Sequence, residues 1–65
     1  MSLPNAPIER IIRKAGAERV SEDAVDELRE AVEEAGAEIA QEASELAEHA
    51  NRNTVTKGDI EMATK

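Results

Sequence analysis

Carboxylates are the most numerous side chains in this chain that could carry out chemistry. Residues 21–50 hold eleven of the fifteen acids and a single base, Arg29. Neighbouring carboxylates can act as an acid–base pair when a pocket perturbs the pKa of one of them. The acids that neighbour one another at helical spacing are Glu33, Glu34, Glu38, Glu42 and Glu45. A convex, solvated helix offers no such pocket, so the sequence predicts that the protein is not an enzyme.

Metal-binding residue types are scarce. The chain has one histidine and no cysteine, which argues against a structural zinc site and rules out a disulfide. We therefore expect no metal, no other cofactor and no small-molecule substrate.

Basic side chains are grouped toward the two ends of the chain. The net charge is +2 over residues 1–20, −10 over 21–50 and +1 over 51–65, which sums to −7. The bases of the first segment are Arg10, Arg13, Lys14 and Arg19. Two predicted helix N-termini, at Ser21 and Thr56, add unpaired backbone amides that can hold an anion. Composition by itself favours a simpler explanation, a solvated basic face with ordinary helix caps.

The element that must position these groups is a long helix predicted over Ser21 to Ala50. The segment contains no proline and one glycine, and its apolar residues recur at steps of three and four. As one helix it would be roughly 45 Å long, whereas a chain of this size has a radius of gyration of ~11 Å. The residues of the stripe are Leu28, Val32, Ala35, Ile39, Ala43, Leu46 and Ala50.

The composition indicates what covers this stripe. The 65 residues include no aromatic residue, and twelve of the 26 hydrophobic residues are alanine. Small domains are marginal alone, and without disulfides or a metal the remaining way to stabilise one is oligomerisation. We therefore expect two long helices to cross antiparallel at Ala35-Gly36, where small side chains permit a close backbone approach.

Two short helices are predicted to flank the long one. The first opens at Ala6-Pro7 and stops at Gly16, and the second runs over about 57–65. Ser21 and Thr56 are the expected N-caps of the long and last helices, with Val20 and Val55 before them as hydrophobic staples. Each loop is expected to hold a two-residue strand that pairs only with another copy. The fold class is all-α, as a single domain over 1–65.

No apolar run is long enough to span a membrane and no signal-peptide layout is present, so the expected location is the cytoplasm.

Several pieces of the chain resemble an archaeal histone, without gaps over essentially its whole length. They are Leu3-Pro4-x-Ala6-Pro7-Ile8, Arg10-Ile11-Ile12, Ala15-Gly16-Ala17-Glu18-Arg19-Val20-Ser21, His49-Ala50 and Arg52-x-Thr54-x-x-x-x-Asp59-Ile60. The resemblance implies a histone fold and an antiparallel handshake dimer that wraps double-stranded DNA without reading its sequence. It also implies stacking of dimers into longer assemblies and association with the nucleoid.

The resemblance also implies roles for individual residues. Arg19 would enter the minor groove, while Arg10 and Arg13, helped by Lys14, would meet phosphates. Thr54 would contact phosphate from the second loop. The other positions placed against DNA are Val20, Ser21, Asn53, Val55 and Thr56.

Three further sets of residues concern assembly. An Arg52–Asp59 ion pair would clamp the second loop. Dimers would join one another through Leu46, His49, Asp59 and Met62. The expected dimer core, taken from the apolar stripe, is Leu28, Val32, Ala35, Gly36, Ile39 and Ala43.

The acidity of the chain leaves two hypotheses open. Two copies would carry −14, twice the −7 of one chain, and Asn53 stands where the family commonly has lysine. An acidic surface suits a salty cytoplasm, where screening over ~3 Å at molar salt mutes repulsion from DNA. Alternatively, the protein is an acidic interaction module, as a heterodimer partner or a chaperone of basic proteins, with weak or no DNA binding.

Overall fold

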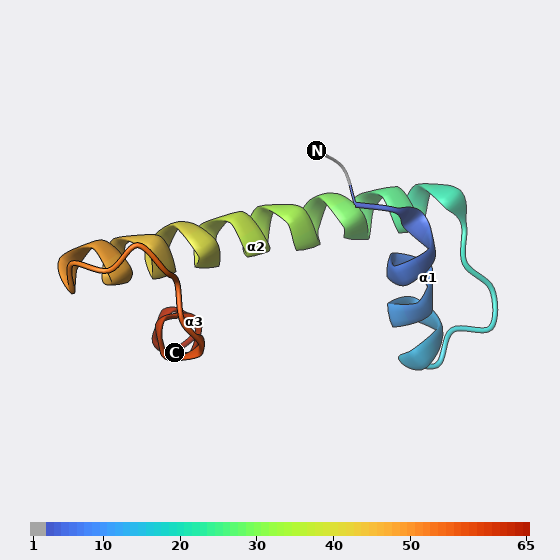
Figure 1. Cartoon of the computed structure of the whole chain (residues 1–65). Coiled ribbons are helices and arrows are strands. Elements are labelled where there is room, and N and C mark those ends of the chain that lie inside the picture. Colours follow the sequence, from blue (N-terminus) through green and yellow to red (C-terminus); the bar gives the residue numbers. More distant parts are fainter. Residues whose placement is uncertain (1–2) are drawn as a thin grey trace. The chain divides into compact units, whose positions relative to one another are not determined.

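The computed structural model describes residues 3–65 and contains three α-helices in this range (Figure 1). They are α1 (Asn5–Lys14), α2 (Glu22–His49) and α3 (Lys57–Ala63). Residues 3–65 contain no strand, so the predicted all-α class is confirmed. The two-residue strands expected in the loops are absent from this single chain, which offers them no second backbone to pair with.

Helix α2 has a defined signal at each end. The Ser21 hydroxyl accepts the Ala24 N–H at 3.1 Å, and acids occupy the first turn, where they interact favourably with the helix dipole. At the other end Asn51 adopts a left-handed conformation, with φ 57°. The Asn51 N–H donates to the Glu48 carbonyl and the Arg52 N–H to the Ala47 carbonyl, both at 2.9 Å, which is a Schellman ending. With 28 residues, α2 is about 42 Å long.

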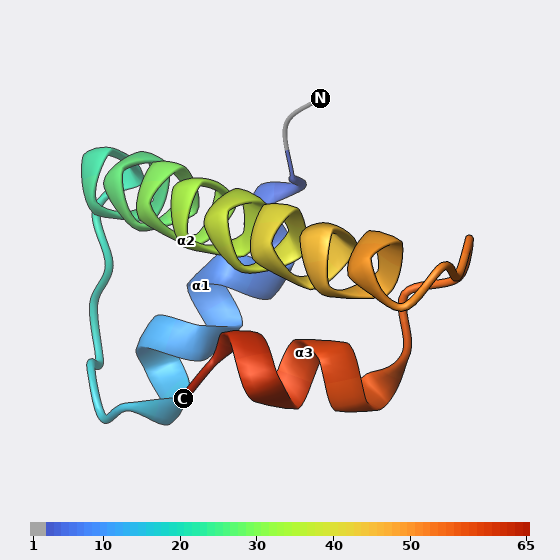
Figure 2. The same ribbon diagram turned by 90° about the vertical axis from the view of Figure 1, so that its left-hand side faces the viewer.

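Helix α1 ends where the sequence predicts. It begins at Asn5, after Pro4, and its last residue is Lys14. Gly16 follows at φ 114°, a conformation that a residue with a Cβ rarely adopts. The chain then runs as an extended loop to Ser21 (Figure 2).

The chain divides into two compact units, with the boundary between Glu34 and Ala35. In the first, α1 packs on the early turns of α2, and Ile8 and Val25 are buried. A polar network ties Arg29 of α2 to the start of the chain. Its guanidinium donates to the Asn5 side-chain oxygen at 2.5 Å and pairs with acids of α2 one turn before and one turn after it, Asp26 and Glu33.

The second unit joins the late turns of α2 to α3. Its buried apolar residues are Ala43 and Ala47, at 0% and 3% exposure. Small side chains at these positions allow α3 and the loop before it to lie close to α2. Ala43 was predicted to belong to the dimer core; its own unit already buries it, and its contribution to a dimer core stays a prediction. Periodicity identifies an apolar position but not the neighbour that covers it.

The remainder of the predicted dimer core is not buried by its own chain. Leu28, Val32 and Ile39 are half-buried, and Ala35 and Gly36 are exposed. With only four hydrophobic residues buried among those described, each chain retains apolar surface that a partner can cover. Other large apolar side chains are also exposed: Leu3, Ile11, Val55, Ile60 and Met62.

Substituting Gly36 tests whether a second helix crosses α2 there. Within the chain, a Cβ at Gly36 would meet no atom within 4 Å, so helix propensity alone predicts that Gly36→Ala stabilises by about 1 kcal/mol. A partner backbone at the crossing would clash with that Cβ. We expect Gly36→Ala to lower the urea midpoint of the dimer at fixed protein concentration.

Gly58→Ala is the matched control. Its added Cβ would lie 3.8 Å from the Thr56 hydroxyl oxygen, an ordinary contact, so the substitution should raise the midpoint. A dimer that becomes more stable with Gly36→Ala would show that no close crossing occurs at this position.

Candidate nucleic-acid interface

Helix α1 and the first loop carry exposed basic side chains. Arg10, Lys14 and Arg19 are exposed. None of the three forms an ion pair within residues 3–65. The turn at Gly16 follows Lys14 and leads into the loop that carries Arg19. All three bases belong to the first unit.

Arg13 differs from these bases because its guanidinium has partners. One amino group pairs with the Glu9 carboxylate at 3.2 Å, and the other donates to the Glu18 carbonyl oxygen at 3.1 Å. The side chain thus connects α1 to the first loop. The i,i+4 spacing of Glu9 and Arg13 signalled the ion pair in the sequence, but the bond to a loop carbonyl depends on the turn at Gly16.

The residues before α2 match their predicted positions. Val20 is half-buried and Val25 is buried, and both line the same shallow pocket at the start of α2. Ser21 is exposed at the N-terminus of α2, and its hydroxyl satisfies the Ala24 amide.

The second loop is organised by Arg52 and Asp59. The Arg52 guanidinium meets both carboxylate oxygens of Asp59, each at 2.8 Å, and also donates to the Thr54 carbonyl at 3.0 Å. Planar two-point pairing of this kind is the strongest geometry available to an arginine and a carboxylate. It holds the loop between α2 and α3 in one conformation.

Asp59 also closes the N-terminus of α3. Its carboxylate accepts the Thr56 N–H at 2.9 Å, while the Thr56 hydroxyl accepts the Asp59 N–H. The hydrogen bonds from Arg52, followed by the one from the Thr56 amide, hold the pKa of Asp59 well below its usual range. The same contact raises the pKa of Arg52 above its ordinary value.

The capping box takes up two of the donors at the N-terminus of α3. The amides of Thr56 and Asp59 are both hydrogen-bonded within it. A carboxylate at this position competes with phosphate for the same donors. The loop side chains before α3 remain exposed: Asn53, Thr54, Val55 and Thr56.

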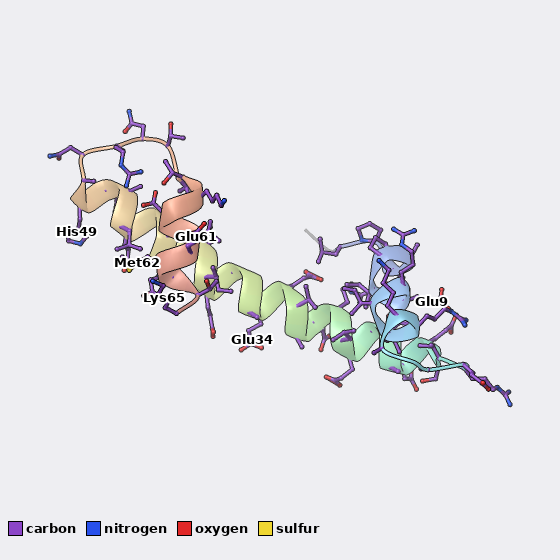
Figure 3. All side chains as sticks on the ribbon, turned by 90° about the horizontal axis from the view of Figure 1, so that it is seen from below. Glu9, Glu34, His49, Glu61, Met62 and Lys65 are labelled. Carbon is purple, nitrogen blue, oxygen red and sulfur yellow. The ribbon has the colours of Figure 1, made fainter. Side chains whose placement is uncertain are left out.

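The predicted contact set between dimers is only partly exposed. His49, in the last turn of α2, and Met62, on α3, extend away from the ribbon (Figure 3). Leu46 is half-buried. Asp59 is 6% exposed, and its carboxylate is paired with Arg52 inside its own unit, the clamp expected from the sequence. Its additional role between dimers stays a prediction.

The role of Arg29 was not predicted. Its network with Asn5 and Glu33 also includes the Leu3 N–H, which donates to the Glu33 carboxylate at 3.4 Å. The i,i+4 spacing of Arg29 and Glu33 was visible in the sequence. Contact with Asn5, 24 residues away along the chain, required the fold.

Two kinds of feature are missing from residues 3–65. This part of the chain contains no cluster of three His, Asp or Glu side chains placed to hold a metal ion. It also contains no helix long and apolar enough to cross a membrane.

Comparison with known proteins defines the family. The family model for "Histone-like transcription factor (CBF/NF-Y) and archaeal histone" matches residues 1–64. One of the subunits of the archaeal histone HAN1 of Thermococcus zilligii is 56% identical over 63 residues, covering 97% of this chain and 94% of that protein. "Probable archaeal histone 3" of Methanocaldococcus jannaschii is 49% identical over the same shares. The chain belongs to this family of histone-fold proteins.

Membership confirms the resemblance seen in the sequence and decides between the two open hypotheses. The protein is an architectural DNA-binding protein with a histone fold, and such folds dimerise. The alternative, an acidic interaction module with weak or no DNA binding, is not favoured.

The low pKa of Asp59 makes a pH-dependent prediction. A carboxyl whose pKa is lower in the folded state than in the unfolded state stabilises the fold while it is charged. This contribution is complete above the unfolded pKa, near 3.8, and is lost as the pH falls through the lower, folded pKa. Asp59→Asn retains the shape and one acceptor but loses the charge. We expect the variant to be less stable than the parent at pH 7, with a difference that shrinks below about pH 4.

Urea unfolding at fixed protein concentration, from neutral pH down to acid, measures this difference. Glu61→Gln is the control, because Glu61 is exposed and pairs with Lys57 only at 3.6 Å. A stability difference for Asp59→Asn that does not change with pH would contradict the assignment.

Proposed function

We propose that two copies form an antiparallel handshake dimer through α2 and bend double-stranded DNA around its outer surface. The observation that carries the proposal is the exposed group Arg10, Lys14 and Arg19, which lies on α1 and the first loop, while most of the acids lie on α2. Bases without protein partners can replace the counterions of phosphates, and this exchange supplies sequence-independent affinity.

Arg19 is the proposed minor-groove side chain. Histone-type wrapping inserts arginines wherever the minor groove faces inward and reads deformability instead of base edges. Arg10 and Lys14 would bind phosphates, and Val20 and Ser21 would lie against the same backbone.

The second loop contributes a weaker contact. Thr54 offers a hydroxyl to phosphate, and Val55 and Thr56 flank it. The Arg52–Asp59 pair supports this role by fixing the loop before DNA arrives. Asn53 supplies no charge here, so the loop adds less to the salt dependence of binding than a basic residue would.

The acidic face of α2 is compatible with DNA binding at high salt. Glu34, Glu38, Glu42 and Glu45 are exposed. Screening at molar salt acts over ~3 Å, so these carboxylates repel phosphates only at contact. Because these glutamates are solvated on an exposed helix, we also propose that the protein has no catalytic activity. We place it in the cytoplasm, on the chromosome.

The proposed assembly is a homodimer of a single histone-fold domain, with exchange for a related chain possible through the same stripe. Higher assemblies would form through Leu46, His49, Asp59 and Met62. What supports this is the exposure of His49 and Met62 beside a half-buried leucine.

Substituting Arg19 tests the DNA interface. Arg19→Ala should weaken binding to random-sequence duplexes and to any single sequence by a similar factor. It removes two contacts per dimer, so the slope of log affinity against log salt should become shallower by about 2. Fluorescence anisotropy across a salt series measures both quantities.

Lys65→Ala is the matched control, since it removes an exposed positive charge outside the proposed interface. It should leave the slope within error of the parent. An intact parent dimer that binds no duplex at low salt would rule out the proposed function.

His49 tests stacking separately from dimerisation. His49→Ala should abolish species larger than the dimer while leaving the dimer intact. Analytical ultracentrifugation at several concentrations, with and without DNA, distinguishes the species. Unchanged higher assemblies in the variant would contradict the proposed interface.

A further inference from the structure

We propose that Arg13 is a positioning residue: it holds the first loop so that Arg19 is presented to DNA, and it does not itself bind phosphate. This inference rests on the proposed function of Arg19. It assigns the first loop a clamp that corresponds to the Arg52 clamp of the second loop.

The two loops share one arrangement of groups. In each, an arginine near the end of a helix donates to a carbonyl in the following loop, and the same guanidinium pairs with a carboxylate. Arg13 reaches the Glu18 carbonyl at 3.1 Å and Glu9 at 3.2 Å. Arg52 reaches the Thr54 carbonyl at 3.0 Å and Asp59 at 2.8 Å. The held carbonyl lies three residues before the cap Ser21 in one loop and two before the cap Thr56 in the other.

The carbonyl held by Arg13 belongs to the peptide bond that joins Glu18 to Arg19. Because the peptide group is planar, fixing its oxygen also fixes the orientation of the Arg19 amide. The direction in which the Arg19 side chain leaves the backbone is thereby restricted. A loop ordered in advance loses less conformational entropy when DNA binds.

The first clamp is weaker than the second. The side chains of Arg13 and Glu9 are 51% and 44% exposed, whereas that of Asp59 is 8% exposed. Exposed ion pairs contribute little to global stability. The clamp should therefore alter the conformation of the loop and the affinity for DNA, with little change in the stability of the fold.

The same contacts make Arg13 a poor phosphate ligand. Its positive charge is already matched by Glu9, and that carboxylate would repel a phosphate brought to the guanidinium. If the Arg13 guanidinium turned to a phosphate, it would also release the Glu18 carbonyl, and the loop would lose this hydrogen bond. Arg10 and Lys14 have no such partners within the described chain.

Comparing Arg13→Lys with Arg13→Gln separates positioning from phosphate binding. Lysine keeps the charge but cannot hold the carboxylate and the carbonyl with one planar group. We expect Arg13→Lys to weaken DNA binding about fivefold, as much as Arg13→Gln does, with the salt slope of the parent retained in both. Parent-like affinity in Arg13→Lys, with a slope shallower by about 2 in Arg13→Gln, would overturn the proposal.

A double-mutant cycle shows whether Arg13 acts through Arg19. In an Arg19→Ala background, Arg13→Lys should weaken binding much less than it does in the parent, because no Arg19 side chain remains to be positioned. Additive losses would mean that the two arginines contact DNA independently, and would overturn the proposal.

Loop dynamics in the free dimer test the clamp without DNA. Backbone ¹⁵N order parameters of residues 18–20 should fall in Arg13→Lys and in Glu9→Gln, and stay at the parent value in Lys14→Gln. Order parameters that do not change in Arg13→Lys would refute the clamp even if DNA binding were lost. A parent dimer that binds no DNA would instead refute the proposed function and leave this measurement interpretable.

Discussion

The structure depends on an apolar stripe along α2 that its own chain leaves partly open. α1 buries Ile8 and Val25 against the early turns, and α3 covers Ala43 and Ala47 near the end, but Gly36 at the middle remains exposed. Four buried hydrophobic side chains among those described are too few to offset the conformational entropy of a 65-residue chain. Folding and association are therefore best regarded as one process, in which a second histone-fold chain completes the core.

The distribution of charge follows from the same constraint. Helix α2 carries most of the acids, and the bases proposed to bind DNA lie on α1 and the first loop. Within the first unit, Arg29 is bonded to Asp26, Glu33 and Asn5, so this arginine of α2 supports the fold of its own unit. Net charge is thus a poor guide to this protein, whereas the position of each charge is informative.

Local signals in the sequence were sufficient for much of the fold. The caps at Ser21 and Thr56, the stop at Gly16 and the extent of α2 all follow from interactions within a few residues, and the structure has them close to where they were predicted. Sequence signals were less decisive where a side chain had two possible sets of neighbours. Ala43 lies on the stripe and is covered by its own unit, and Asp59, expected both in the loop clamp and between dimers, is paired with Arg52 in the clamp. Periodicity and resemblance do not show which of these neighbours a side chain meets, because that depends on which groups the folded chain brings together.

The burial of Ala43 and Ala47 has a consequence for how this sequence can diverge. Both alanines lie on the side of α2 that other residues of the second unit cover. A larger side chain at either position would have to move its neighbours. Exposed positions of α2, by contrast, can exchange one charge for another without repacking. Evolution can therefore retune the electrostatic character of this protein for a new ionic environment by surface substitutions alone, while alanines that hold no charge and bind no ligand remain the least changeable part of the chain.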